Sequence, residues 1–244
     1  MVAELRRSTG PGVAASFRAA AFDFYYQSIR LVPANVLWGA SLLAWLAFGL
    51  GGGPLVALAT APLLAVPYAA VARLAALTVR GHDVVLSDVV DAIRRFGLSA
   101  LIAGVTVTLA VAILASNVIL GANLGGAAGW VLSTLAVTGL VALWVYGIAF
   151  WVLLVDPERD ARSSASKARL AALLAVAIPG RLSWLSFLLF GLLLLSTVAV
   201  VALLTIAPAY ALLVAGRYAL PLADRLERWL EGRPGADDPG ATAR

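Results

Sequence analysis

The sequence predicts an all-α, polytopic membrane protein with about six transmembrane helices arranged as three hairpins. All 31 charged residues, 18 basic and 13 acidic, lie in four blocks. The stretches between the blocks, 31–72, 96–155 and 182–216, contain no Asp, Glu, Lys or Arg. A helix needs roughly 20 apolar residues to cross a bilayer core, so each stretch is long enough for a hairpin. The composition agrees, because 13% of the residues are charged, against about 25% in a typical soluble domain.

The placement of the charges predicts the topology. The blocks at 1–30, 73–95 and 156–181 are net positive, and the turns within the uncharged stretches are neutral. Basic loops of membrane proteins stay in the cytoplasm. We therefore expect a multi-pass membrane protein whose two termini and charged blocks are all cytoplasmic. Residues 1–230 are predicted to form one helical membrane domain.

Turn residues divide the first two uncharged stretches into spans. The first hairpin is predicted to comprise spans at about 33–50 and 55–79, separated by the glycines at 51–53. The second comprises spans at about 98–120 and 127–155. Gly121, Gly125 and Gly129 have the GxxxG spacing of closely packed helices, but they fall in the predicted turn, so we interpret them as loop glycines.

The third uncharged stretch, of 35 residues, allows two interpretations. It can form two short spans, at about 182–201 and 204–220, or one long span kinked at Pro208, which would give five spans in all. We prefer two, because six spans keep the C-terminal charges on the cytoplasmic side. Residues 231–244 are rich in Gly, Pro and Asp and are predicted to form a disordered cytoplasmic tail.

A short segment with a helical apolar stripe precedes each hairpin, at about 17–31, 87–96 and 167–177. We expect these segments to be interfacial amphipathic helices on the cytoplasmic leaflet. The alternative is that each segment is a cytoplasmic extension of the span that follows it.

Four polar residues of the spans are candidates for a functional site, because polar groups are costly inside a membrane. They are Asn35, Arg73, Tyr146 and Arg217. The two arginines lie near span ends, where snorkelling to lipid headgroups is the preferred interpretation and contact with a solute is the alternative. Asn35 is expected to bond to a helix start or to a neighbouring helix.

Several function classes have no support in the sequence. No acidic residue lies within a span, which argues against a proton-coupled carrier, and no phosphate loop is present. The chain has no Cys and one His, His82, and no base accompanies its Ser and Thr residues. We therefore expect no enzymatic activity, no cofactor and no metal. The basic residues flank apolar spans, which favours the lipid bilayer over nucleic acid as their partner.

The carboxylates at 156–160 are interpreted as part of a solvated, salt-bridged surface.

The sequence LVPANVLW at 31–38 forms the entry into the first span. This motif resembles the start of the first span in the YesL-like family of bacterial membrane proteins, whose function is unknown. Residues 59–77, 87–97 and 166–180 are similar to later family segments, although Ala61 replaces an expected Gly and Val90 an expected aromatic residue. The resemblance implies a bacterial inner-membrane protein, and it supplies no site residues.

Members of that family are often encoded beside genes for carbohydrate ABC transporters, which suggests ABC-transporter permeases as partners. Our first hypothesis is therefore an accessory or scaffold component of a membrane transport system, with carbohydrate uptake as the candidate process. The alternative is a small transporter or channel with a polar path between the helices. The substrate and the oligomeric state are not predicted.

Overall fold

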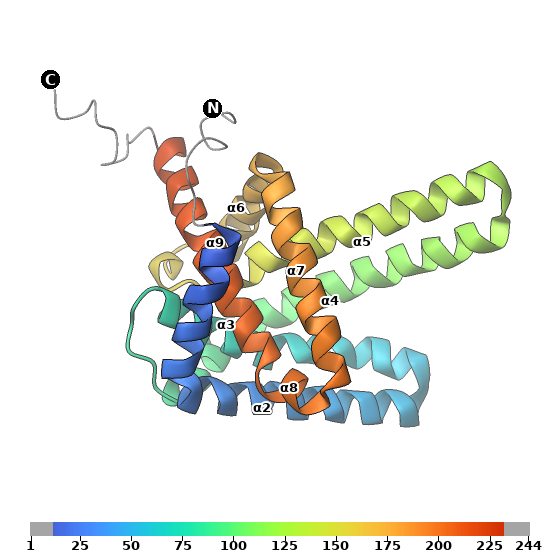
Figure 1. Cartoon of the computed structure of the whole chain (residues 1–244). Coiled ribbons are helices and arrows are strands. Elements are labelled where there is room, and N and C mark those ends of the chain that lie inside the picture. Colours follow the sequence, from blue (N-terminus) through green and yellow to red (C-terminus); the bar gives the residue numbers. More distant parts are fainter. Residues whose placement is uncertain (1–11, 232–244) are drawn as a thin grey trace, which may run out of the picture.

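The computed structural model describes residues 12–231, which fold into helices joined by short turns. The described residues contain no strand, which confirms the all-α prediction. Figure 1 shows the arrangement of the elements. The α-helices are α2 (Val13–Thr60), α3 (Ala65–Val79), α4 (Ser87–Leu124), α5 (Gly126–Leu154), α6 (Ser164–Ala177), α7 (Pro179–Val198), α8 (Val200–Thr205) and α9 (Ala207–Leu230), and two short 3-10 helices are η1 (Ala61–Leu64) and η2 (Pro157–Arg159).

Five described helical segments are long and apolar enough to cross a membrane. They match the first five predicted spans in order, and they are Val13–Gly49, Gly51–Val79, Ser87–Leu124, Gly126–Leu154 and Pro179–Val198. This confirms a polytopic helical membrane protein. The sixth predicted span, 204–220, falls in α8 and α9 and is not among the five, because Arg217 and the charged residues that follow lower the hydropathy of α9.

Helix α9 lies at the centre of the bundle. Fifteen of its 24 residues are buried, and it contacts α2, α3, α5, α6, α7 and α8. A helix that is covered by other helices does not need the hydropathy of one that faces lipid. The third uncharged stretch thus forms a hairpin of α7 and α9 with α8 at the corner, and Pro208 lies in the first turn of α9, where proline is tolerated.

The first hairpin reverses at Gly53, inside the helix designated α2. Gly53 has φ of 80°, a left-handed conformation that favours glycine, and Pro54 follows it. The indole nitrogen of Trp45 donates a hydrogen bond of 2.8 Å to the carbonyl oxygen of Ala57 across the reversal. The predicted position of this turn, at the glycines 51–53, is therefore confirmed.

The second hairpin, α4 and α5, extends beyond the rest of the molecule (Figure 1). The chain reverses at Gly125 and Gly126, which both have positive φ. A Cβ atom on Gly121 would lie 2.6 Å from the carbonyl oxygen of Gly129, so the two helix backbones are nearly in contact. Gly125 is a turn residue, as predicted, but the interpretation of Gly121 and Gly129 as loop glycines is wrong. The turn is so short that both are helical and face each other.

The amphipathic segments differ in part from the expectation. Helix α2 begins at Val13 and α4 at Ser87, so the first two segments are continuous with the spans that follow. The first part of α2, dark blue in Figure 1, runs at a steep angle to the remainder of the helix, which contains Pro33. Only the third segment forms a separate helix, α6. Its apolar face packs on the protein, with Leu170 and Leu174 buried.

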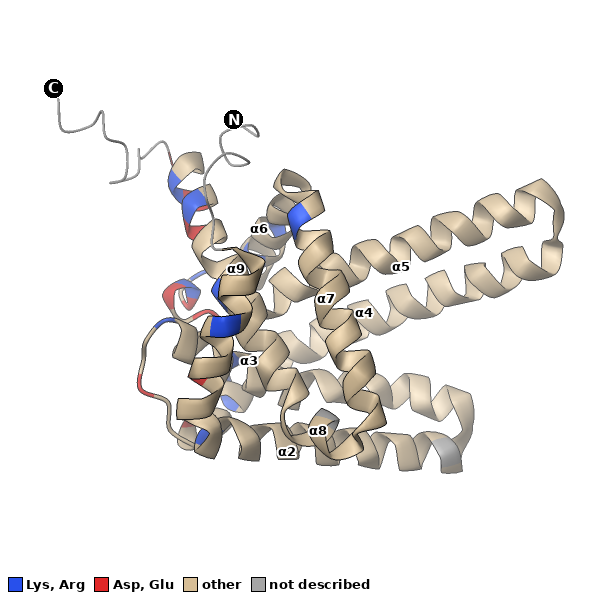
Figure 2. Ribbon diagram, viewed as in Figure 1, with Lys and Arg blue, Asp and Glu red and all other residues tan. Residues whose placement is uncertain are grey.

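The charged residues gather at one end of the bundle, as Figure 2 shows, and the outer ends of the two hairpins carry none. We call this region the charged end. Helix α9 ends there with Glu231 as its C-cap. The rest of the predicted disordered tail, 232–244, lies outside the described residues.

The close approach of Gly121 and Gly129 makes a testable prediction. The variant Gly121→Val places a branched side chain against the facing backbone, which should lower the free energy of unfolding by about 1–3 kcal/mol. Thermal unfolding in detergent measures the effect. The control is Gly191→Val in α7, where an added Cβ meets no atom within 4 Å. Equal melting temperatures for the two variants would contradict the close packing.

Candidate functional site

Asn35 joins the first span to the start of the central helix. Its side chain is fully buried, and its Oδ1 accepts a hydrogen bond of 3.1 Å from the backbone nitrogen of Ala209. The bond satisfies one of the free donors at the start of α9. This contact is one of the two expected for Asn35. Its Nδ2 has no hydrogen-bond partner among the described residues.

Arg73 is held by groups of the protein rather than by lipid headgroups. Its guanidinium donates two hydrogen bonds, of 2.9 and 2.8 Å, to the carboxylate of Asp160 and one of 2.7 Å to the carbonyl oxygen of Val155. It also lies 5.3 Å from the ring centre of Phe96. Because the side chain is only 13% exposed, the snorkelling interpretation is wrong for Arg73. The carboxylate comes from the turn after α5, which the span pattern did not place near α3.

Arg217 and Tyr146 also have partners within the chain. The Arg217 guanidinium donates hydrogen bonds of 2.6 and 2.7 Å to the carboxylate of Asp23, which joins α9 to the first part of α2. The Tyr146 ring stacks on Phe150, with ring centres 5.3 Å apart and an interplanar angle of 18°.

The structure does not bring the four candidates together. Arg73 lines a pocket at the charged end with His82 and Asp91, whereas Arg217 lines a different pocket with Pro221. Asn35 is enclosed between α2 and α9, and Tyr146 packs on its own helix. The contacts of Asn35, Arg73 and Arg217 join separate elements of the fold, whereas the ring contact of Tyr146 lies within α5.

The largest concentration of charge is a cluster that the sequence did not predict. We call it the ionic cluster, and it consists of Arg80, Asp156, Arg159, Asp224 and Glu227. Arg80 donates hydrogen bonds of 2.7–3.0 Å to the carboxylates of Asp156 and Asp224. Arg159 bonds to the same two carboxylates and, at 2.7 and 3.2 Å, to that of Glu227. The cluster joins the end of α3, the turn containing η2 and the end of α9.

Burial distinguishes the ionic cluster from a surface network. The Asp156 side chain is fully buried, and that of Arg159 is 3% exposed. The carboxylates at 156–160 are salt-bridged, as expected, but the expectation that they are solvated is wrong for Asp156. Breaking a buried ion pair is costly, because the remaining charge is left unpaired away from water.

The electrostatics of the ionic cluster favour the charged forms. Burial by itself would raise the pKa of Asp224, but hydrogen bonds from Arg80 and Arg159 outweigh this effect and hold the pKa below its ordinary value. Nearby, burial lowers the pKa of Lys167, whose ammonium donates a hydrogen bond of 2.7 Å to the carbonyl oxygen of Leu154.

In residues 12–231 no group of three His, Asp or Glu residues is placed to hold a metal ion.

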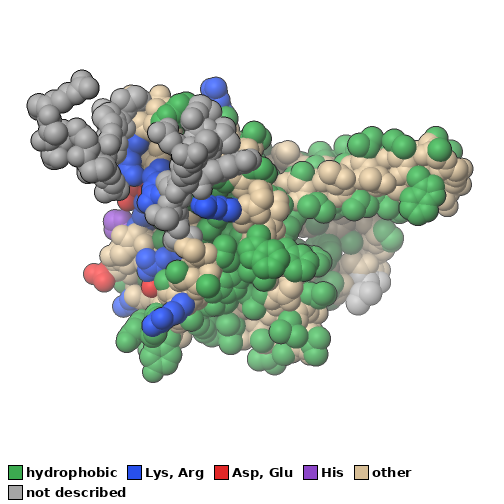
Figure 3. Space-filling view, turned by 45° about the horizontal axis from the view of Figure 1, so that its top comes forward, with side chains coloured by type: hydrophobic (Ala, Val, Ile, Leu, Met, Phe, Trp, Pro, Cys, Tyr) green, Lys and Arg blue, Asp and Glu red, His purple; other side chains and the backbone are tan. Residues whose placement is uncertain are grey.

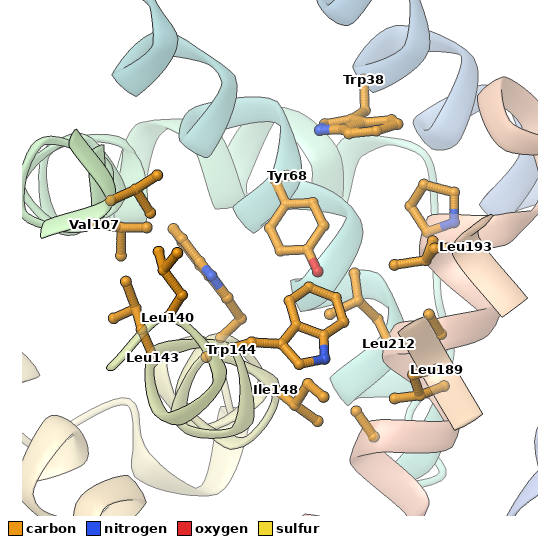
Figure 4. A pocket seen from close by; sticks show the side chains of 16 residues that line it. Trp38, Tyr68, Val107, Leu140, Leu143, Trp144, Ile148, Leu189, Leu193 and Leu212 are labelled. Atoms are coloured by element: carbon orange, nitrogen blue, oxygen red, sulfur yellow. The ribbon is translucent and has the colours of Figure 1, made fainter. Parts of the chain in front are cut away.

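The main cavity between the spans is apolar. It has a volume of about 450 Å³ and lies among α2, α3, α4, α5, α7 and α9. Figure 4 shows its aromatic residues, among them Trp38, Tyr68 and Trp144. None of the four polar candidates lines it. This pocket was not predicted from the sequence, because its walls come from helices whose relative positions only the folded chain determines.

Comparisons with known proteins find no match to this chain, whether among family models, curated proteins or solved structures.

The lowered pKa of Asp224 predicts how stability depends on pH. A carboxyl whose pKa is lower in the folded than in the unfolded state stabilises the fold above its unfolded pKa. For Asp224 this contribution is complete above the ordinary value of 3.8 and is lost as the pH falls through the lowered folded value. Melting temperatures in detergent between pH 2 and 7 should follow this course.

The variant Asp224→Asn should lower the free energy of unfolding at neutral pH by about 1–3 kcal/mol, because it removes one of the charged partners of Arg80 and Arg159. The variant should also show a smaller decrease of the melting temperature as the pH falls from 7 to 2. Asp83→Asn, at an exposed loop carboxylate, is the control. If the melting temperature of Asp224→Asn depended on pH in the same way as that of the wild type, the ionic cluster would not be the source of the pH-dependent stability.

Proposed function

We propose that the protein is an accessory or scaffold component of a membrane transport system in the bacterial inner membrane. In this proposal it binds another integral membrane protein, with a carbohydrate ABC-transporter permease as the candidate partner. The charged end faces the cytoplasm together with both termini. The class of partner and the bacterial membrane come from the YesL-like resemblance, and the mode of binding comes from the second hairpin.

The observation that carries this proposal is the extension of the hairpin of α4 and α5 beyond the bundle. In its most apolar segment α4 is 11% buried, the lowest value among the five candidate spans. Large apolar side chains are exposed on both of its helices, including Ile113 and Ile119 on α4 and Trp130 and Leu135 on α5. Figure 3 shows hydrophobic side chains along the extended hairpin, with the charged side chains toward the other side of the view.

The geometry of this hairpin suits a partner within the bilayer. Helices in lipid associate through packing and shape rather than through hydrophobicity alone. A hairpin whose helices are already tightly joined at Gly121 and Gly129 offers two rigid outer faces without first having to be ordered. It therefore loses little conformational entropy on binding.

The polar residues support an accessory role more than the alternative, a small transporter or channel. A transporter for a polar solute needs polar groups along a shared path. Here Arg73 and Arg217 are bound to Asp160 and Asp23, and the cavity between the spans has an apolar lining. Both arginines are thus engaged in contacts that join elements of the fold.

Site-specific cross-linking tests the proposed interface. The chain has no Cys, so a single substitution gives one reactive position. In Trp130→Cys, on the exposed hairpin, we expect a membrane-permeable thiol cross-linker to trap a defined partner in native membranes, to be identified by mass spectrometry. The matched control is Phe187→Cys, at an exposed apolar position on α7.

A permease recovered from Trp130→Cys and not from Phe187→Cys would support both the role and the interface. Recovery of the protein alone from both variants, with both thiols shown to react, would contradict the proposal.

A flux assay tests the transporter alternative. Liposomes that contain the purified protein should release a trapped sugar no faster than protein-free liposomes. A rapid release that falls in Arg73→Gln or Arg217→Gln would instead establish a polar path at these residues, and the accessory role would be abandoned. The melting temperature of each variant must be measured as well, because both arginines form ion pairs that join elements of the fold.

A further inference from the structure

The apolar pocket between the spans has the chemistry of a binding site. No charged side chain lines it, and most of its walls are Leu, Val, Ile, Ala and Trp side chains. Ligand sites are typically apolar cavities of about 300–1,000 Å³ with a few placed polar groups. At about 450 Å³ the pocket falls within this range.

The Tyr68 hydroxyl is the polar group that distinguishes the pocket from a simple packing defect. In Figure 4 it points into the pocket, toward the side where Trp144 lies. The ring is held by Trp38 and Trp151, at centre-to-centre distances of 6.2 and 5.3 Å. No hydrogen bond joins this hydroxyl to another of the residues 12–231, whereas the Trp144 indole donates one of 3.1 Å to the carbonyl oxygen of Ser186. A tyrosine hydroxyl in an apolar site usually has a partner, so a ligand can supply one.

The pocket is elongated and reaches the outer surface of the helices. Its α5 wall runs from Leu140 to Trp151, a distance of about 16 Å along a helix axis. Two of its wall residues, Val111 and Trp144, are 42% and 37% exposed. These residues belong to segments apolar enough to span the membrane, so the opening faces lipid and not water. A molecule can therefore enter sideways from the bilayer.

We propose that this pocket binds one chain of a neutral lipid, with an oxygen of that lipid hydrogen-bonded to the Tyr68 hydroxyl. A charged headgroup is excluded from the interior, because no lining side chain could compensate its desolvation. An apolar chain matches the length of the pocket and its Leu, Val and Trp walls. Two sources share this chemistry: an acyl chain with its ester carbonyl, and a free long-chain alcohol. The proposal does not depend on the accessory role.

Photolabelling of the full-length protein in phosphatidylcholine vesicles tests the proposal. One arm uses a phosphatidylcholine with a diazirine in its acyl chain, and the other uses a long-chain alcohol with the same group. After irradiation, labelled residues are mapped by mass spectrometry. We expect labels at pocket residues, such as Leu212, which is 3% exposed, in addition to the general labelling of exposed positions such as Leu135.

Gly147 provides a variant that blocks the pocket. It lines the pocket, and a Cβ atom added to it meets no atom within 4 Å. The variant Gly147→Leu should therefore fold normally and lose the labels inside the pocket while keeping those at Leu135. Gly191→Leu is the matched control, because Gly191 also has open space around its Cβ position and does not line the pocket.

The variant Tyr68→Phe tests the hydrogen bond. It keeps the ring and removes the hydroxyl, and it should lower the labelling of the pocket by about two- to tenfold.

Labelling by the alcohol alone would identify a free long-chain lipid as the ligand, and labelling by phosphatidylcholine would identify a bilayer lipid. Both results support the site. Pocket labelling that is absent, or that Gly147→Leu leaves unchanged in a monodisperse protein, would overturn it.

Discussion

The attachment of α9 to its neighbours is the constraint on which the rest of the structure depends. The helix carries two partly buried charges, Arg217 and Asp224, and a charge that is partly removed from water is stabilised by a charged partner. Asp23 of α2 binds Arg217, and Arg80 and Arg159 bind Asp224. At the other end of α9, Asn35 binds the backbone nitrogen of Ala209. These contacts fix the register of α9 against α2 and α3, and the remaining helices pack around it.

This arrangement explains why the polar residues of the spans do not form a path. Arg73 and Arg217 each satisfy a carboxylate on another element, so their charge serves assembly and is not available to a solute. The carboxylates come from segments outside the predicted spans, namely the start of α2 and the turn after α5. Once these pairs are made, the space left between the spans is enclosed by apolar side chains. The same contacts thus favour an accessory role and leave a pocket suited to a lipid chain.

The two hairpins near the start of the chain use glycine differently, and the difference affects their shape. At Gly53 a single left-handed residue reverses the chain within α2. In the second hairpin, Gly125 and Gly126 form the turn, and Gly121 and Gly129 let the two helices approach closely. This hairpin extends beyond the bundle, and large apolar side chains are exposed on both of its helices.

The sequence by itself determined the class of the protein, five of its long helices and the glycine turns. These follow from local properties: the lengths of uncharged stretches, the hydropathy and the conformational freedom of glycine. Only the tertiary structure decided that α9 is central, that Asp156 is buried, and that Arg73 binds Asp160 rather than lipid. These features depend on pairs of residues that are far apart in the chain. The distribution of charges along the sequence shows how many charges there are, but it does not show which of them form pairs. The Tyr68 pocket is of the same kind, because six helices must be placed before it exists.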